Sequence, residues 1–98
     1  MSLPIVLRED ARAEFDQAFD WYERQKPGLG VEFVAKVQDV FDRISNLPLL
    51  HAIVFEDVRR APVKKFPYAV YYRPEPDQVV VIAVFHNRRD PSVLQSRN

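Results

Sequence analysis

The sequence predicts an α+β fold: an N-terminal strand, an antiparallel helical hairpin and a C-terminal antiparallel β-meander. Residues 11–25 and 31–46 both place apolar side chains at helical spacing. The second half of the chain is instead rich in β-branched and aromatic residues with polar turns between them. At 98 residues the chain is long enough for one domain, residues 1–98, with a small core.

The first two elements are expected to be a strand and a helix. The apolar run of "PIVLRED" predicts a strand from Leu3 to Leu7. We expect Asp10 to cap a helix over residues 11–25, with Glu14 favoured near the positive end of that helix. Its apolar stripe consists of Ala11, Phe15, Ala18, Phe19 and Tyr22.

The segment "KPGLG" is expected to end this helix and to form a tight turn. Proline disfavours helical geometry in the residue before it, and both glycines of the protein lie in this segment. A second apolar stripe then predicts a helix that ends near Asn46, before Pro48. Two helices joined by so short a turn should form an antiparallel hairpin.

The remaining elements are expected to form the sheet. "HAIVFEDVRRAPV" predicts two short strands around Glu56-Asp57, and "KKFPYAVYYR" predicts a third. After the polar turn "PEPD", the segment "QVVVIAVFH" is apolar on both faces. Such a strand is expected in the interior of the sheet, covered on both sides.

Composition excludes several classes of site. The chain has no cysteine, which excludes disulfides and thiolate chemistry and fits a cytoplasmic location. We expect no signal peptide and no membrane-spanning segment, because the sequence has neither a basic N-terminal segment followed by a long apolar run nor an apolar stretch of about 18 residues. We also expect no cofactor. A metal site is not expected, because His51 and His86 lack a second ligand at a recognisable spacing. The carboxylates of Asp16, Asp20 and Glu23 are interpreted as a solvated helix face rather than as paired catalytic acids.

A cationic cluster follows the last predicted strand, in "VFHNRRDPS". Net charge is zero, but residues 1–49 carry nine acidic and six basic side chains, whereas residues 50–98 carry five acidic and eight basic ones. One interpretation is a solvated loop in which Asp90 pairs with Arg88 or Arg89. The other is a site for an anionic partner, with His86 beside the two guanidinium groups. Other cations that would extend that surface are Arg59, Arg60, Lys64 and Lys65.

Three blocks of the sequence resemble a known family. They are "AFDWYERQKPGLGVEFVAKV", "KKFPYAVYYR" and "VVVIAVFHNRRDP", and in this order they are similar to the RelE/ParE superfamily. These proteins are toxins of bacterial type II toxin–antitoxin systems and include plasmid stabilisation proteins. The resemblance covers nearly the whole chain. It implies a helical hairpin against an antiparallel sheet, and a cognate antitoxin whose C-terminal segment wraps the toxin.

Two positions favour the ParE-like branch, whose members inhibit DNA gyrase by protein binding without an established nuclease centre. RelE-like nucleases, which cut mRNA on the ribosome, carry an arginine and a tyrosine where this chain has Ala69 and Leu94. We therefore expect a gyrase inhibitor with no catalytic residues. The alternatives are a ribosome-dependent mRNA endonuclease and a non-toxic relative that binds only its antitoxin. The residues expected to contact the target are His86, Arg88, Arg89, Arg59 and Lys64.

The antitoxin is expected to bind the helical hairpin and the sheet edge. A core this small should leave Phe19, Trp21 or Leu29 partly exposed, and such side chains often anchor partners. The sequence leaves open whether the chain forms a homodimer or a hetero-oligomer with the antitoxin.

Overall fold

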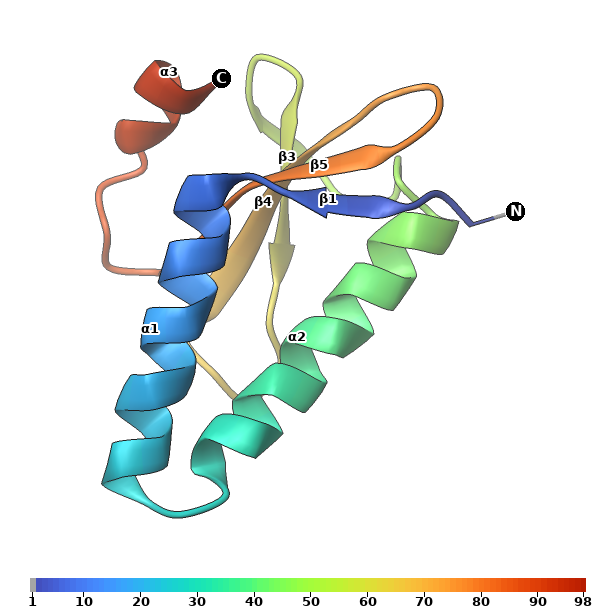
Figure 1. The fold of residues 1–98 in the computed structure, drawn as a ribbon. Helices are drawn as coiled ribbons and strands as arrows, with labels where there is room; N and C mark the ends of the chain where they lie inside the picture. The colour runs from blue at the N-terminus through green and yellow to red at the C-terminus, as the bar shows by residue number, and fades with distance from the viewer. Residues whose placement is uncertain (1) are drawn as a thin grey trace.

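A computed structural model describes residues 2–98, and it confirms the predicted α+β architecture. A five-stranded sheet has the order β1-β5-β4-β3-β2, and Figure 1 shows the hairpin of α1 and α2 with the short α3 set apart from it. β1 runs parallel to β5, and the other neighbours are antiparallel. The elements are β1 (Ile5–Leu7), α1 (Glu9–Gln25), α2 (Leu29–Asn46), β2 (Ile53–Phe55), β3 (Val58–Pro62), β4 (Tyr68–Pro74), β5 (Val79–His86) and α3 (Val93–Arg97).

The start of α1 corrects one expectation, because Asp10 does not cap the helix. The backbone N–H of Arg8 still donates to Val81 on β5, at 3.1 Å, so the chain leaves the sheet at Arg8 and the helix begins at Glu9. Asp10 therefore lies inside the first turn. Its carboxylate lies 3.5 Å from Nε of Arg97 in α3.

Glu23 organises the turn between the two helices. Its carboxylate accepts hydrogen bonds from the backbone N–H groups of Gly28 (3.1 Å), Gly30 (2.8 Å) and Val31 (3.2 Å). These bonds, first of all the one from Gly28, lower the pKa of Glu23. A side chain from α1 thus satisfies the free N–H groups of α2, which begins at Leu29 rather than at Val31 as expected. The predicted end of this helix, near Asn46, is confirmed.

β5 is buried on both sides, as the sequence predicted. Its register against β4 shifts once, because Tyr72 lies opposite Val81 and Tyr71 lies opposite Ala83, which leaves Ile82 as an extra residue. After this bulge Val84 faces the helices, and His86 follows on the same side, with its ring 5.4 Å from that of Tyr68. The bulge therefore decides which face of the sheet carries His86.

The face of the sheet away from the hairpin has a core of its own, which we call the second core. The sequence did not predict the element that covers it, α3, which is five residues long. Leu94 of α3 is 1% exposed, so the C-terminal segment is part of the packed structure. The second core consists of Val58, Ala69, Tyr71, Val80, Ile82, Ala83, Phe85 and Leu94.

Candidate functional site

The cationic turn after β5 is not held by Asp90. The carboxylate of Asp90 accepts a hydrogen bond from the backbone N–H of Ser92 at 2.9 Å, which shapes the turn before α3. Within residues 2–98 it pairs with neither Arg88 nor Arg89. Arg88 uses its backbone N–H to bond Nδ1 of His86 at 3.0 Å, and its side chain is exposed. The interpretation in which Asp90 pairs with Arg88 or Arg89 is therefore wrong.

Arg89 instead pairs with Glu14 on α1. Its Nη1 donates to the Glu14 carboxylate at 2.6 Å, and its guanidinium carbon lies 5.2 Å from the centre of the Phe85 ring. The same carboxylate accepts hydrogen bonds from Arg97 at 2.9 and 3.0 Å and from the backbone N–H of Val84 at 3.1 Å. Glu14 thereby joins α1, β5, the cationic turn and α3.

The position of Glu14 follows from the length of β1. β1 pairs with β5 only as far as Val81, so the edge of β5 beyond that residue lacks a strand neighbour. The carboxylate of Glu14, only 10% exposed, accepts the Val84 N–H that would otherwise remain unpaired. Its hydrogen bonds are also the main cause of a raised pKa for Arg97. From the sequence, Glu14 was expected only to favour the positive end of the helix.

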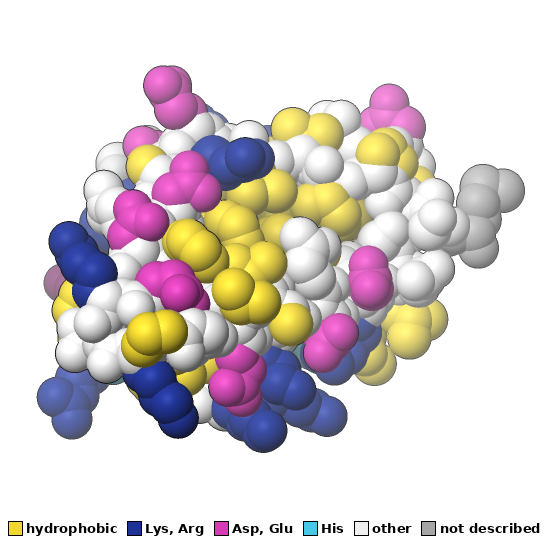
Figure 2. All heavy atoms as spheres, turned by 60° about the horizontal axis from the view of Figure 1, so that its bottom comes forward, with side chains coloured by type: hydrophobic (Ala, Val, Ile, Leu, Met, Phe, Trp, Pro, Cys, Tyr) yellow, Lys and Arg dark blue, Asp and Glu magenta, His cyan; other side chains and the backbone are white. Residues whose placement is uncertain are grey.

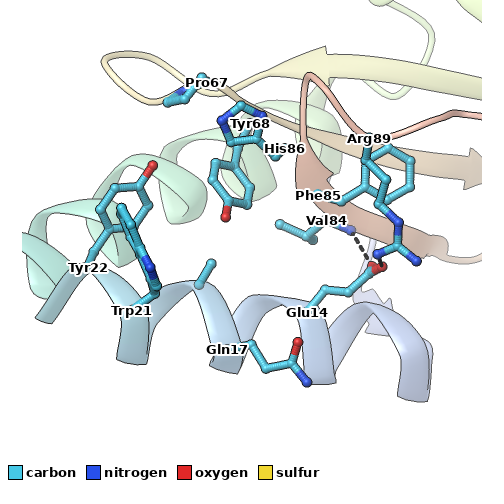
Figure 3. A pocket seen from close by; sticks show the side chains of 11 residues that line it. Glu14, Gln17, Trp21, Tyr22, Pro67, Tyr68, Val84, Phe85, His86 and Arg89 are labelled. Carbon is cyan, nitrogen blue, oxygen red and sulfur yellow. Dashed lines mark hydrogen bonds and ion pairs between the residues drawn. The ribbon is translucent and has the colours of Figure 1, made fainter. Parts of the chain in front are cut away.

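An open pocket of about 590 Å³ lies between α1 and the adjoining ends of β4 and β5. Figure 3 shows Trp21 and Tyr22 at one end, and Glu14, Gln17 and Arg89 at the other. Burial raises the pKa of both Tyr22 and Tyr68, so these phenols stay neutral at physiological pH. The pocket is thus aromatic at one end and polar at the other, with His86 in its wall.

The expected binding residues fall in different places. Trp21 is half exposed and lines the pocket, whereas Phe19 and Leu29 are half-buried, with Leu29 packed against the main core. Figure 2 shows hydrophobic side chains gathered in the middle of one face of the molecule, with charged side chains around them. His86 and Arg89 also line the pocket. Of the three aromatic and aliphatic anchors, Trp21 is therefore the best presented.

Lys64 and Arg60 lie toward the cationic turn, but Arg59 does not. Lys64 is exposed in the connection from β3 to β4, which reaches the turn through a hydrogen bond from Asn87 N–H to Pro67 at 2.8 Å. Arg60 donates to the Asn87 side chain at 2.8 Å. Arg59 lies on the opposite face, because neighbouring residues of a strand point to opposite sides.

Arg59 is held by the loop that follows α2. Its Nη1 donates to the carbonyl of His51 at 2.7 Å and to that of Leu49 at 3.2 Å. Beside it, the hydroxyl of Tyr72 donates to the carbonyl of Pro48 at 2.9 Å. The side chain thus fixes the loop, and of the two neighbouring arginines that were expected to extend the cationic surface only Arg60 lies beside the turn.

Ala69 and Leu94, which were expected to separate RelE-like from ParE-like members, lie in the second core. Ala69 is 0% exposed and Leu94 is 1% exposed. Neither position presents a side chain to solvent. No group of three or more His, Cys, Asp or Glu suited to a metal occurs within residues 2–98. Over the same residues, no helix has the length and apolar character needed to span a bilayer.

Comparisons with known proteins identify a family and a related fold. The family model described as "ParE toxin of type II toxin-antitoxin system, parDE" matches residues 5–91. A solved structure titled "Chromosomal ParDE TA system from P. aeruginosa" is similar, with a TM-score of 0.75 and 13% identity over 87% of this chain and 96% of that chain. At that identity the likeness shows the fold. Among curated proteins nothing matches the chain.

Proposed function

The chain belongs to the ParE toxin family of type II toxin–antitoxin systems, and we propose that it inhibits DNA gyrase by binding it. A cognate antitoxin, which membership of this family implies, would neutralise it. Gyrase acts on the bacterial chromosome, so the proposal places the protein in the cytoplasm. The proposed activity is inhibition by contact and needs no reaction at the toxin itself.

The burial of Ala69 and Leu94 is the observation that favours gyrase inhibition over mRNA cleavage. Cleavage of a phosphodiester needs a cation beside the crowded phosphate and a group that moves a proton. Both positions at which RelE-like nucleases carry these groups are packed into the second core, at 0% and 1% exposure. Replacing them with nuclease residues would require the second core to be rebuilt.

The target surface is proposed to be the cationic turn with its neighbours on the sheet. Arg88 presents an exposed guanidinium, and Arg60 and Lys64 extend the positive surface along the same end of the sheet. Guanidinium groups bind carboxylates in two-pronged fashion, which suits an acidic patch on a protein. His86 and Arg89 then form the boundary between this surface and the pocket.

The antitoxin is proposed to occupy the pocket, with Trp21 as a central contact. A half-exposed tryptophan beside Tyr22 offers a large apolar area at little cost in side-chain entropy. The Glu14–Arg89 pair at the other end offers polar contacts that can fix the orientation of a bound segment. Phe19 and Leu29 stay proposed antitoxin contacts on the flank of the hairpin.

Induced expression in bacteria tests the toxic activity. Growth, plasmid supercoiling and mRNA integrity are followed together after induction, with Arg88→Ala as the variant and exposed Arg12→Ala on α1 as the matched control. We expect growth arrest with loss of negative supercoiling, relieved by Arg88→Ala but not by Arg12→Ala. Codon-positioned mRNA cuts with normal supercoiling would contradict the proposal.

Binding of the antitoxin is tested separately with Trp21→Ala. The control is Val31→Ala, because Val31 is exposed (61%) on the other helix. Removing an aromatic contact at the centre of an interface costs about 2 kcal/mol or more, so antitoxin affinity should fall about 30-fold or more in titration calorimetry. Equal affinities for the two variants would place the antitoxin elsewhere.

A further inference from the structure

Exposed hydrophobic side chains are concentrated at one edge of the sheet. Five of the eight large hydrophobic side chains that are exposed within residues 2–98 belong to the segment 47–54. Scattered exposed apolar residues are normal, but a concentration of them along one edge indicates an interaction site. Ile53 lies beside Leu49 on one side of this edge, and Val54 lies on the other side beside Arg60. The five are Leu47 (55%), Leu49 (68%), Leu50 (59%), Ile53 (54%) and Val54 (48%). We call this group the β2 edge.

The backbone of this segment also lacks a neighbour on one side. β2 is the last strand of the sheet, and within residues 2–98 it pairs only with β3. An outer strand presents N–H and C=O groups that can pair with another chain. Proteins usually protect such an edge with charged side chains, yet residues 47–55, "LPLLHAIVF", contain no Lys, Arg, Asp or Glu. Two features protect this strand in part, its length of three residues and a bulge between Ile53 and Phe55.

We propose that the β2 edge is a dimerisation surface that takes a second copy of this chain. Two copies related by a two-fold axis would pair their β2 strands in antiparallel fashion and join the two sheets into one. With the axis at Val54, Glu56 of one copy lies opposite Ala52 of the other and Asp57 lies opposite His51, so no two like charges meet. A surface without charges suits a copy of itself and offers nothing that would select a partner of opposite charge.

The exposed area is sufficient for such a dimer. A half-exposed Leu, Ile or Val side chain presents on the order of 100 Å², so the five side chains present about 500 Å² on each copy. Complete burial of these side chains on two copies would remove at most about 1,000 Å² from water, which is the minimum for a weak but specific interface. We therefore expect a dimer that dissociates in the micromolar range. It leaves the pocket beside Trp21 uncovered, because that pocket lies between α1 and the ends of β4 and β5. The cationic turn is closer to the edge, because Asp90 and Pro91 line a pocket together with Val54.

Sedimentation equilibrium of the purified chain is the first test. Over about 1 to about 300 µM the mass should rise from 11.5 kDa toward twice that value. Val54→Lys places a charge on the edge and should weaken association at least tenfold, while Val31→Lys, at a residue of α2 that is somewhat more exposed (61% against 48%), should not. A wild-type chain that stays monomeric, or two variants that associate equally, would overturn the proposal.

Cysteine cross-linking tests the geometry, because the chain has no cysteine of its own. Ala52→Cys, Ile53→Cys and Val54→Cys are made singly, with Val31→Cys as the control, and each is treated with a mild oxidant. The residue nearest the two-fold axis should form a disulfide-linked dimer at least tenfold faster than the control. Equal rates for all four variants would show that the β2 edges do not meet. If the cysteines on the β2 edge become protected from oxidation only when the antitoxin is added, the edge binds the antitoxin, and the dimer proposal is likewise overturned.

Discussion

Replacing Glu14 by glutamine should destabilise the fold far more than replacing any exposed acid. The change removes the charge that faces Arg97 and Arg89, while its amide oxygen still accepts the Val84 N–H. The side chains of Glu14 and Arg97 are 10% and 11% exposed, so water replaces little of what is lost. Breaking a buried pair by removing one partner costs about 3–5 kcal/mol.

The pair of Glu14 with Arg89 contributes less to stability than its pair with Arg97, because the Arg89 side chain is 43% exposed. Arg97 also keeps its contact with Asp10, at 3.5 Å, which compensates part of the change. We therefore expect Glu14→Gln to lower the free energy of unfolding by about 2–4 kcal/mol. For a domain of this size that is a fall of roughly 10–25 °C in the melting temperature.

Urea denaturation followed by circular dichroism measures this loss, with Asp16→Asn as the matched control. Asp16 lies on the same helix and pairs with Arg12, but both side chains are more than half exposed. Asp16→Asn should lower the free energy of unfolding by about 0.5 kcal/mol or less. A Glu14→Gln variant within about 0.5 kcal/mol of the parent would refute a role for Glu14 in joining α1, β5 and α3.

Three further variants follow from the same contacts. The free energy of unfolding of Arg88→Ala should lie within about 0.5 kcal/mol of that of the parent, whereas Arg89→Ala should lower it by about 1 kcal/mol because its ion pair with Glu14 is lost. Both variants should no longer inhibit growth. An Arg88→Ala variant that remains toxic would contradict this. Gly30→Ala should cost about 1–3 kcal/mol in urea denaturation, because its Cβ would lie 2.7 Å from the carbonyl oxygen of Phe19. Glu23 has a lowered pKa in the folded state, so its contribution is present above its unfolded pKa and disappears as pH falls through the folded value. Between about pH 5 and about pH 3 the parent should therefore lose more stability than Glu23→Gln, and parallel curves would oppose this reasoning.

Local patterns predicted most of the fold. The two apolar stripes predicted α1 and α2, and the uninterrupted apolar run of residues 79–85 predicted the doubly buried strand β5. α3 could not be found in this way, because five residues are too few to show a helical period. Its place depends on Leu94 filling the second core, a contact between distant parts of the chain.

The candidate site was harder to predict because its partners are remote in sequence. Asp90 is the carboxylate nearest to Arg89 in sequence, yet Arg89 forms its ion pair with Glu14, which is 75 residues away. Alternation along a strand predicts that Arg59 and Arg60 face opposite sides, but not which of them faces the cationic turn. That depends on the pairing of β3 with β4. A single extra residue, Ile82, likewise decides the face on which His86 lies.

The most direct test of the proposed function is a supercoiling assay with purified components. Relaxed plasmid, bacterial gyrase and ATP are incubated with increasing amounts of the toxin, alone or with its antitoxin, and Arg88→Ala serves as the variant. We predict that the toxin blocks supercoiling in proportion to its concentration, that the antitoxin restores it, and that Arg88→Ala is at least tenfold weaker. Undiminished supercoiling at saturating toxin, with mRNA cut in a translating extract by the same preparation, would contradict the account.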